Sequence, residues 1–183
     1  MIKEQQKKIE IGTVTKLDTS GKQAKITYLG IGSNLGNKKD NIEKAKSLLI
    51  ENNINLISVS SYYKSPSWPN PKNPEFINIV VKIKCTLKPK ILLELCKSIE
   101  TKLGRKKTFK NAPRECDIDI IDFDGKISRN GLILPHKMMH KRNFVLFPLF
   151  EIDKNWIHPI MSTNIKKLIF SLPNKDIRSI KQI

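Results

Sequence analysis

At 183 residues the chain is long enough for one domain with a full hydrophobic core, whereas two complete domains would be a tight fit. Its apolar content of 39% lies within the globular range, and no apolar stretch approaches the length needed to cross a bilayer. The formal charge of +17, from 34 basic and 17 acidic residues, predicts an anionic partner: nucleic acid, a membrane surface or a phosphorylated small molecule.

The N-terminal segment, residues 1–25, is polar and of mixed charge. It has neither a helical apolar stripe nor the apolar stretch of a secretory signal. We interpret it as a flexible extension, the remnant of an upstream domain or sequence introduced by cloning, and place the folded domain at 26–183. Without such a signal, we expect a cytoplasmic protein.

Strands dominate the first half of the domain. Residues 26–32 form an apolar run that ends in glycine, which predicts a buried strand followed by a turn at SNLGN. The next segment predicts a helix whose apolar face carries Ile42, Ala45, Leu48 and Leu49. Residues 54–65 alternate like a strand, the prolines of 66–74 predict a stiff loop, and 76–85 predicts another strand.

The second half begins with a predicted helix over residues 87–104. Pro89 suits its first turn and Gly104 its end. Its apolar stripe comprises Leu92, Leu95, Ile99 and Leu103. Residues 116–123 then predict a strand, and FDGKI predicts a turn that leads into a further strand.

Two further helices are predicted near the C-terminus, within 136–152 and over 163–172. The resulting order β-α-β-β-α-β predicts an α+β fold with a ferredoxin-like core. In this fold helices cover a mainly antiparallel sheet, as a three-layer αβα sandwich.

The three cysteines, Cys85, Cys96 and Cys116, show no CxxC spacing and lie in largely apolar runs. We therefore predict buried free thiols with no metal or redox role.

Two aspartates, Asp117 and Asp119, alternate with isoleucine in the strand CDIDIIDF. Residues two apart on a strand point to the same face, so these carboxylates project together from Cα atoms roughly 7 Å apart. Such a pair can bind Mg²⁺, which prefers a few carboxylates with water and substrate phosphates. A solvent-facing strand with alternating acids is the alternative, but the basic loop before it favours a metal-bound polyphosphate.

That basic loop, RKKTFKNAPR, carries five bases. We assign phosphate contacts to Arg105, Lys107 and Arg114, because arginine binds phosphate with two donors and lysine supplies a point charge. Lys106 and Lys110 are interpreted as solvated.

Other polar residues carry less information. Asp122 and Asp124 are assigned turn or surface roles. His136 stands among cations close to Arg142, so a shared anion site and a structural role are equally supported. The segment GIGSNLG matches neither glycine-rich nucleotide fingerprint, and its glycines are expected to let backbone and ligand approach closely.

Several segments together resemble a known family. They are YLGIGSNLGNKKDNIEKA, SSYYKSPSW, NPEFINIVV, IETKLGR, NAPRECDIDIIDFDG and LPHKMMHKRNFVLFPLFEI. In combination they strongly resemble 6-hydroxymethyl-7,8-dihydropterin pyrophosphokinase, an enzyme family of folate biosynthesis, from about residue 26 to about residue 159. Charge and spacing alone reach only metal-assisted phosphoryl transfer.

The resemblance implies transfer of a pyrophosphoryl group from MgATP to the hydroxymethyl oxygen of the reduced pterin, with release of AMP. It implies that Asp117 and Asp119 bind two Mg²⁺ ions that bridge the ATP phosphates. The nucleotide site would then comprise Glu100, Arg105, Lys107, Arg114, His136 and Arg142.

The resemblance also implies a pterin pocket. Phe76 and Phe144 would sandwich the flat ring, and the Asn78 amide would donate to and accept from its polar edge. From the residues alone, the two phenylalanines are core positions. The loop that lines the pocket would contribute Ser65, Pro66 and Trp68.

Three positions depart from the family pattern. Lys107 stands where arginine is frequent, Lys137 where an aromatic residue is frequent, and Asn111 where some members have tryptophan. None of them alters the aspartate pair.

Two other classes of function remain open at this stage. The charge of +17 suits a nucleic-acid-binding module, but basic residues interleaved with aromatic ones are missing from the sequence. A regulatory domain that binds nucleotide without turnover is the third possibility, which the intact aspartate pair disfavours. The partners we expect are ATP and the pterin, with no nucleic acid, no membrane and a monomeric chain.

Overall fold

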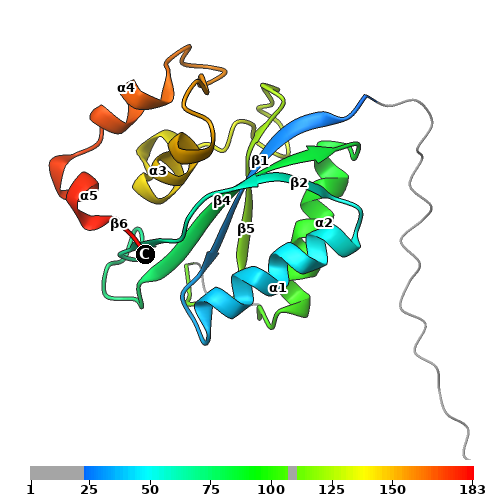
Figure 1. The fold of residues 1–183 in the computed structure, drawn as a ribbon, viewed down its shortest axis with the longest axis horizontal. Coiled ribbons are helices and arrows are strands. Elements are labelled where there is room, and N and C mark those ends of the chain that lie inside the picture. Colours follow the sequence, from blue (N-terminus) through cyan, green and yellow to red (C-terminus); the bar gives the residue numbers. More distant parts are fainter. Residues whose placement is uncertain (1–22, 107–110) are drawn as a thin grey trace, which may run out of the picture.

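The computed structural model describes residues 23–106 and 111–183, in which a sheet lies between two layers of helices (Figure 1). The strands are β1 Lys25–Ser33, β2 Asn55–Val59, β3 Tyr63–Ser65, β4 Phe76–Cys85, β5 Asp117–Phe123 and β6 Lys181–Gln182. The helices are α1 Lys38–Glu51, α2 Pro89–Lys102, the 3-10 turn η1 Met139–Lys141, α3 Asn143–Ile152, α4 Ile165–Phe170 and α5 Asn174–Ser179.

Strand β4 is the centre of the sheet. The strand order is β5-β1-β4-β3-β6, with β2 also paired to β4, and each of these pairs is antiparallel. The predicted α+β class, with helices on a mainly antiparallel sheet, is therefore confirmed. The predicted extension, residues 1–25, lies almost wholly outside the described residues, and β1 already begins at Lys25.

Helices α1 and α2 cover one face of the sheet, and α3 and α4 cover the other (Figure 1). Strand alternation produces the two faces: Leu29 and Ile31 of β1 enter the core under α1 and α2, while Tyr28 enters the core under α3. The first core contains all three cysteines, which are free and buried as predicted. No helix within the described ranges is both long and apolar enough to cross a membrane.

Both long helices begin where the sequence indicates. The side chain of Asn37 caps α1 by accepting a hydrogen bond from the amide of Asp40. Pro89 occupies the first turn of α2, where its missing N–H is not needed. Gly104, with φ +101°, follows the end of α2 and turns the chain toward the basic loop.

The predicted strand 54–65 is two strands, β2 and β3. Ser60 causes the break, because its hydroxyl oxygen accepts the Val80 amide at 3.0 Å. The next amide, of Ser61, leaves the sheet to donate to Glu151 at 3.0 Å. The strand expected after FDGKI is reduced to one bridge between Ser128 and Leu134.

Asp122 is buried, so of the turn or surface role predicted for it the surface role is wrong and the turn role is confirmed. Strict alternation would place it with Ile118 and Ile120, but a bulge in the pairing with β1 moves it to the opposite face. There its carboxylate accepts a hydrogen bond from Trp156 Nε1 at 2.9 Å and one from the Gly125 amide at 3.1 Å. Asp122 therefore closes the turn and also anchors the segment after α3.

Asp153 joins the end of α3 to the sheet. Its Oδ2 accepts hydrogen bonds from Tyr28 Oη at 2.5 Å and from Lys82 Nζ at 2.9 Å. Burial by itself would raise the pKa of Asp153, but these two donors outweigh burial and lower the pKa below its ordinary value.

We expect Asp153→Asn to reduce the free energy of unfolding by about 1 kcal/mol near neutral pH. A carboxylate with a depressed folded-state pKa contributes stability above its unfolded pKa of about 4, and the contribution is lost as the pH falls through the folded pKa. Urea unfolding of both proteins at about pH 6 and about pH 3 measures this. An equal difference at both pH values would contradict the assignment.

Candidate functional site

The aspartate pair lies on the face of β5 that α1 and α2 do not cover. Ile118 and Ile120 point into the core beneath those helices, so alternation turns Asp117 and Asp119 to the opposite face. The Asp117 side chain is 19% exposed and that of Asp119 is 33% exposed. Both carboxylates are therefore within reach of a ligand.

Asp117 lies between two arginines. Arg105 Nη1 donates to its Oδ1 at 2.6 Å, and Arg114 Nη2 donates to its Oδ2 at 2.7 Å. Burial would raise the pKa of Asp117, but the charges of Arg114 and Arg105 dominate and hold that pKa below its usual value. The carboxylate therefore stays charged at neutral pH.

Glu100 lies behind Arg105, with a side chain that is only 2% exposed. Its carboxylate accepts the Ile118 amide at 2.7 Å and pairs with Arg105 Nη1 at 2.8 Å and with Lys97 Nζ at 2.9 Å. Glu100 thus links α2 to β5 and orients Arg105 toward Asp117. Lys107 lies outside the described residues.

Asp119 lies near Arg142 and His136. Arg142 Nη1 lies 3.3 Å from its Oδ2, and His136 Nε2 lies 3.8 Å from the same oxygen. The Met138 amide donates to His136 Nδ1 at 3.2 Å, which leaves Nε2 to carry the proton of the neutral ring. Burial lowers the pKa of His136; Asp119 opposes this, and the Arg142 charge adds to it. His136 therefore presents a neutral N–H donor.

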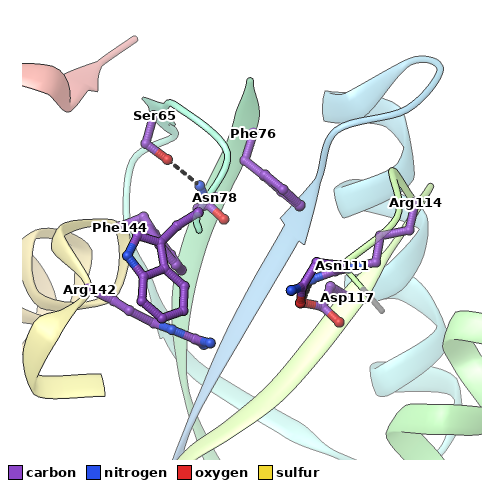
Figure 2. Close-up of a pocket in the computed structure, with 9 residues that line it drawn as sticks. Ser65, Phe76, Asn78, Asn111, Arg114, Asp117, Arg142 and Phe144 are labelled. Carbon is purple, nitrogen blue, oxygen red and sulfur yellow. Dashed lines mark hydrogen bonds and ion pairs between the residues drawn. The ribbon is translucent and has the colours of Figure 1, made fainter. Parts of the chain in front are cut away.

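A cavity opens beside Asp117. Its lining residues are Ser65, Trp68, Phe76, Asn78, Asn111, Arg114, Asp117, Arg142 and Phe144. Figure 2 shows Ser65, Asn78, Arg142 and Phe144 on one side of the cavity, with Asn111, Arg114 and Asp117 on the other.

Arginine side chains cover the aromatic faces of the cavity. The Arg142 guanidinium lies over Trp68 at 5.1 Å and over Phe144 at 5.5 Å from the ring centroids. Arg114 lies over Phe76 at 5.4 Å. Rings that attract a planar cation can also stack on a planar ligand, so these faces are suited to a flat heterocycle.

The amide of Asn78 is held at the base of the cavity. Its Nδ2 donates to Ser65 Oγ at 3.2 Å (Figure 2). A Cβ at Gly32 would stand 2.6 Å from Asn78 Oδ1 and 3.3 Å from Phe76, so only glycine fits beside them. The sequence analysis expected this glycine to allow a ligand to approach the backbone closely. In the structure the group that approaches Gly32 closely is the side chain of Asn78.

Pro66 does not line this cavity. It lies on a neighbouring cavity, which shares Trp68, Arg142 and Phe144 with the first. The structure thus brings together most of the predicted site residues around Asp117 and Asp119, with Pro66 on the outer side.

Asn34 is a site residue that the sequence analysis missed. It is 2% exposed, and its Oδ1 accepts a hydrogen bond from the backbone amide of Arg114 at 2.8 Å. Its own backbone amide donates to the Arg114 carbonyl at 3.1 Å. Its Nδ2 donates to the Pro74 carbonyl at 3.1 Å. Asn34 therefore ties the loop of Arg114 to the loop before β4. A polar residue directly after a buried strand was the available signal.

Asn111 also has an observed role. Its φ of +63° is a conformation that asparagine adopts more readily than most residues. Its carbonyl accepts Asn73 Nδ2 at 3.2 Å, so it joins the same two loops. The positive φ thus explains why asparagine suits this position, where some family members have tryptophan.

The described residues contain no group of three or more His, Cys, Asp or Glu side chains that could hold a metal ion. The two aspartates therefore fit Mg²⁺ only together with oxygen ligands from elsewhere. Phosphate and water supply such ligands.

Comparison with known proteins identifies one family. A protein-family model described as 7,8-dihydro-6-hydroxymethylpterin-pyrophosphokinase (HPPK) matches residues 28–154. The 2-amino-4-hydroxy-6-hydroxymethyldihydropteridine pyrophosphokinase of Aquifex aeolicus is 40% identical over 141 residues, which are 76% of this chain and 88% of the relative. The protein of the same name from Bacillus subtilis is 38% identical over 129 residues, which are 69% of this chain and 77% of the relative.

Some similar proteins are much longer. The folic acid synthesis protein FOL1 of Dictyostelium discoideum is 40% identical over 150 residues, which are 81% of this chain and 23% of that protein. The crystal structure of wild-type Plasmodium falciparum HPPK-DHPS matches with a TM-score of 0.69 at 15% identity. The match covers 90% of this chain and 45% of that one, and shows a shared fold.

Proposed function

The chain belongs to the 7,8-dihydro-6-hydroxymethylpterin-pyrophosphokinase family and has its pyrophosphokinase activity in folate synthesis, and we propose that the cavity beside Asp117 and its charged neighbours perform the reaction. The reaction moves a pyrophosphoryl group from ATP to the hydroxymethyl oxygen of 6-hydroxymethyl-7,8-dihydropterin and releases AMP. One observation carries the proposal: two carboxylates and three arginines meet at the mouth of an aromatic cavity.

The ATP phosphates lie beside Asp117 and Asp119 in this proposal. Two Mg²⁺ ions, held by these carboxylates and the phosphates, would neutralise negative charge and align the transferred group. The low pKa of Asp117 supports this role, because a carboxylate must be ionised to bind metal. When the metal binds, Arg105 keeps its partner Glu100, so no buried charge is left without a partner.

The cationic residues hold and stabilise the phosphates. Arg105, Arg114 and Arg142 offer planar pairs of donors to phosphate oxygens, and the neutral His136 offers its Nε2–H. Phosphoryl transfer depends mainly on such positioning and on electrostatic stabilisation. We assign Lys107 to the same group from its place in the sequence.

The reduced pterin occupies the cavity between Phe76 and Phe144. For this ring to enter, the guanidiniums of Arg114 and Arg142 give up their places over the aromatic faces and become available to the phosphates. The Asn78 amide meets the polar edge of the ring, while Ser65 fixes the amide orientation. Trp68 and Pro66 belong to the loop over the cavity.

Two finer statements belong to the same proposal. The core elements β1-α1-β2-β4-α2-β5 have the sheet order β5-β1-β4-β2, which supports a ferredoxin-like core. We also propose that the enzyme is a monomer.

Calorimetry with substrates tests the site as a whole. The chain is titrated first with an unreactive MgATP analogue and then with 6-hydroxymethylpterin. Saturable pterin binding that depends on the bound nucleotide is the expected result. Salt-sensitive DNA binding without any pterin signal would contradict the proposal and favour the nucleic-acid reading of the positive charge.

A further inference from the structure

Asn143 stands between two residues of the cavity wall, Arg142 and Phe144, but its own side chain points elsewhere. It is 8% exposed, and its Oδ1 accepts the Phe144 amide at 2.7 Å. Its Nδ2 donates to the Asp176 carbonyl at 2.6 Å and to Ser179 Oγ at 3.1 Å. The start of α3 is therefore tied to α5, in the C-terminal tail 174–183.

The same tail also reaches the opposite wall of the cavity. Strand β6 pairs with β3, which carries Ser65 and leads into the loop of Trp68. The Ile183 amide donates to the Tyr62 carbonyl at 2.9 Å, and Gln182 Nε2 donates to Ser61 Oγ at 2.9 Å. The tail thus bridges α3 and β3, and Figure 1 shows α5 and β6 beside these elements.

Little else determines where the tail lies. Helix α5 contains no buried residue, and its Ile177 is only partly buried where it packs against the core under α3. Its bond to Asn143 and its pairing with β3 are therefore its principal anchors. The tail also lies beyond residues 28–154, where the family model matches.

We propose that the tail 174–183 is a clamp that positions the pterin-binding wall, and that Asn143 is the positioning residue through which it acts. The proposal rests on the pterin site proposed above. Holding the start of α3 and the end of β3 in place spares the pterin the entropic cost of ordering them, and this cost appears in affinity. ATP binds beside Asp117 and Asp119 on β5, whereas the tail bonds to the start of α3 and to β3.

A double-mutant cycle tests the clamp. The two perturbations are Asn143→Ala and removal of residues 180–183, which release its two ends. Each should raise the KM for pterin about fivefold, the effect of losing one or two hydrogen bonds, with kcat and the KM for ATP within about twofold of wild type. The combined variant should raise the KM for pterin little more than either perturbation alone, because both act through the same tail.

Asn174→Ala is the matched control, because Asn174 is an exposed asparagine of the same tail. It should leave the KM for pterin unchanged. Hydrogen exchange without substrates is the second readout, and exchange at residues 63–68 should become faster in Asn143→Ala. This readout separates a clamp from a merely local loss at α3.

Either an unchanged KM for pterin in both perturbed proteins or unchanged exchange at 63–68 would overturn the inference. Equal loss of pterin and ATP affinity would also overturn it, since that indicates general unfolding. A wild-type chain that forms no AMP with pterin would count against the proposed site, while the exchange experiment would still decide whether the clamp exists.

Discussion

Asp117→Asn is expected to lower kcat for pterin-dependent AMP formation by about a thousandfold, the usual scale for losing a group that stabilises transition-state charge. The substitution keeps the shape of the side chain but removes the charge that binds metal. Arg105 retains Glu100 and Arg114 retains the Ala112 carbonyl, so the fold should survive. Steady-state AMP release and thermal unfolding, measured on the same preparation, separate the two effects.

Asp124→Asn is the matched control for this variant. Asp124 follows the same strand, has φ +52°, which asparagine also tolerates, and makes only a surface ion pair with Lys25. Its kcat should stay within about twofold of wild type, since exposed pairs contribute little. Near-normal AMP production by Asp117→Asn would remove this residue from the proposed mechanism.

Phe144→Ala is expected to weaken pterin binding about thirtyfold, because stacking on one aromatic ring contributes roughly 2 kcal/mol per base-sized ring. ATP affinity should change little, since the phosphates bind at the aspartates and arginines. Calorimetric titration with the unreactive nucleotide, followed by 6-hydroxymethylpterin, measures both affinities in one protein.

Phe147→Ala controls for the loss of a phenylalanine from the same helix. Phe147 packs against the core under α3 but does not line the cavity. Phe147→Ala should lower the free energy of unfolding, because it truncates a partly buried ring, but it should not weaken pterin binding specifically. If Phe144→Ala weakens both ligands equally, the ring is a structural element of α3 and the pterin assignment fails.

Periodicity predicted the regular parts of this fold well. The predicted strand 76–85 has the bounds of β4, since a buried central strand gives a clear apolar run. The break at Ser60 was missed because it depends on one hydroxyl that competes with the backbone for the Val80 amide. The tail 174–183 was missed because α5 buries none of its residues and so shows no pattern.

The candidate site was only partly accessible from residues alone. Alternation predicted that Asp117 and Asp119 share a face, and the structure agrees. Arg114 lies three residues from Asp117, but the contacts of Asp117 with Arg105 and of Asp119 with Arg142 are tertiary contacts that spacing does not encode. Phe76 and Phe144 looked like core residues, and only the resemblance to a family suggested a pterin pocket. The polar contacts of Asn34 depend on where two loops meet, which no local pattern contains.

Metal stoichiometry tests the central claim most directly. Mn²⁺, which replaces Mg²⁺ at oxygen ligands, can be counted by electron paramagnetic resonance in the presence of an unreactive ATP analogue and pterin. The account predicts two bound ions for the wild-type chain and fewer for Asp117→Asn and Asp119→Asn, with Asp124→Asn unchanged. Equal stoichiometry in all four proteins would contradict a role for this aspartate pair in holding metal.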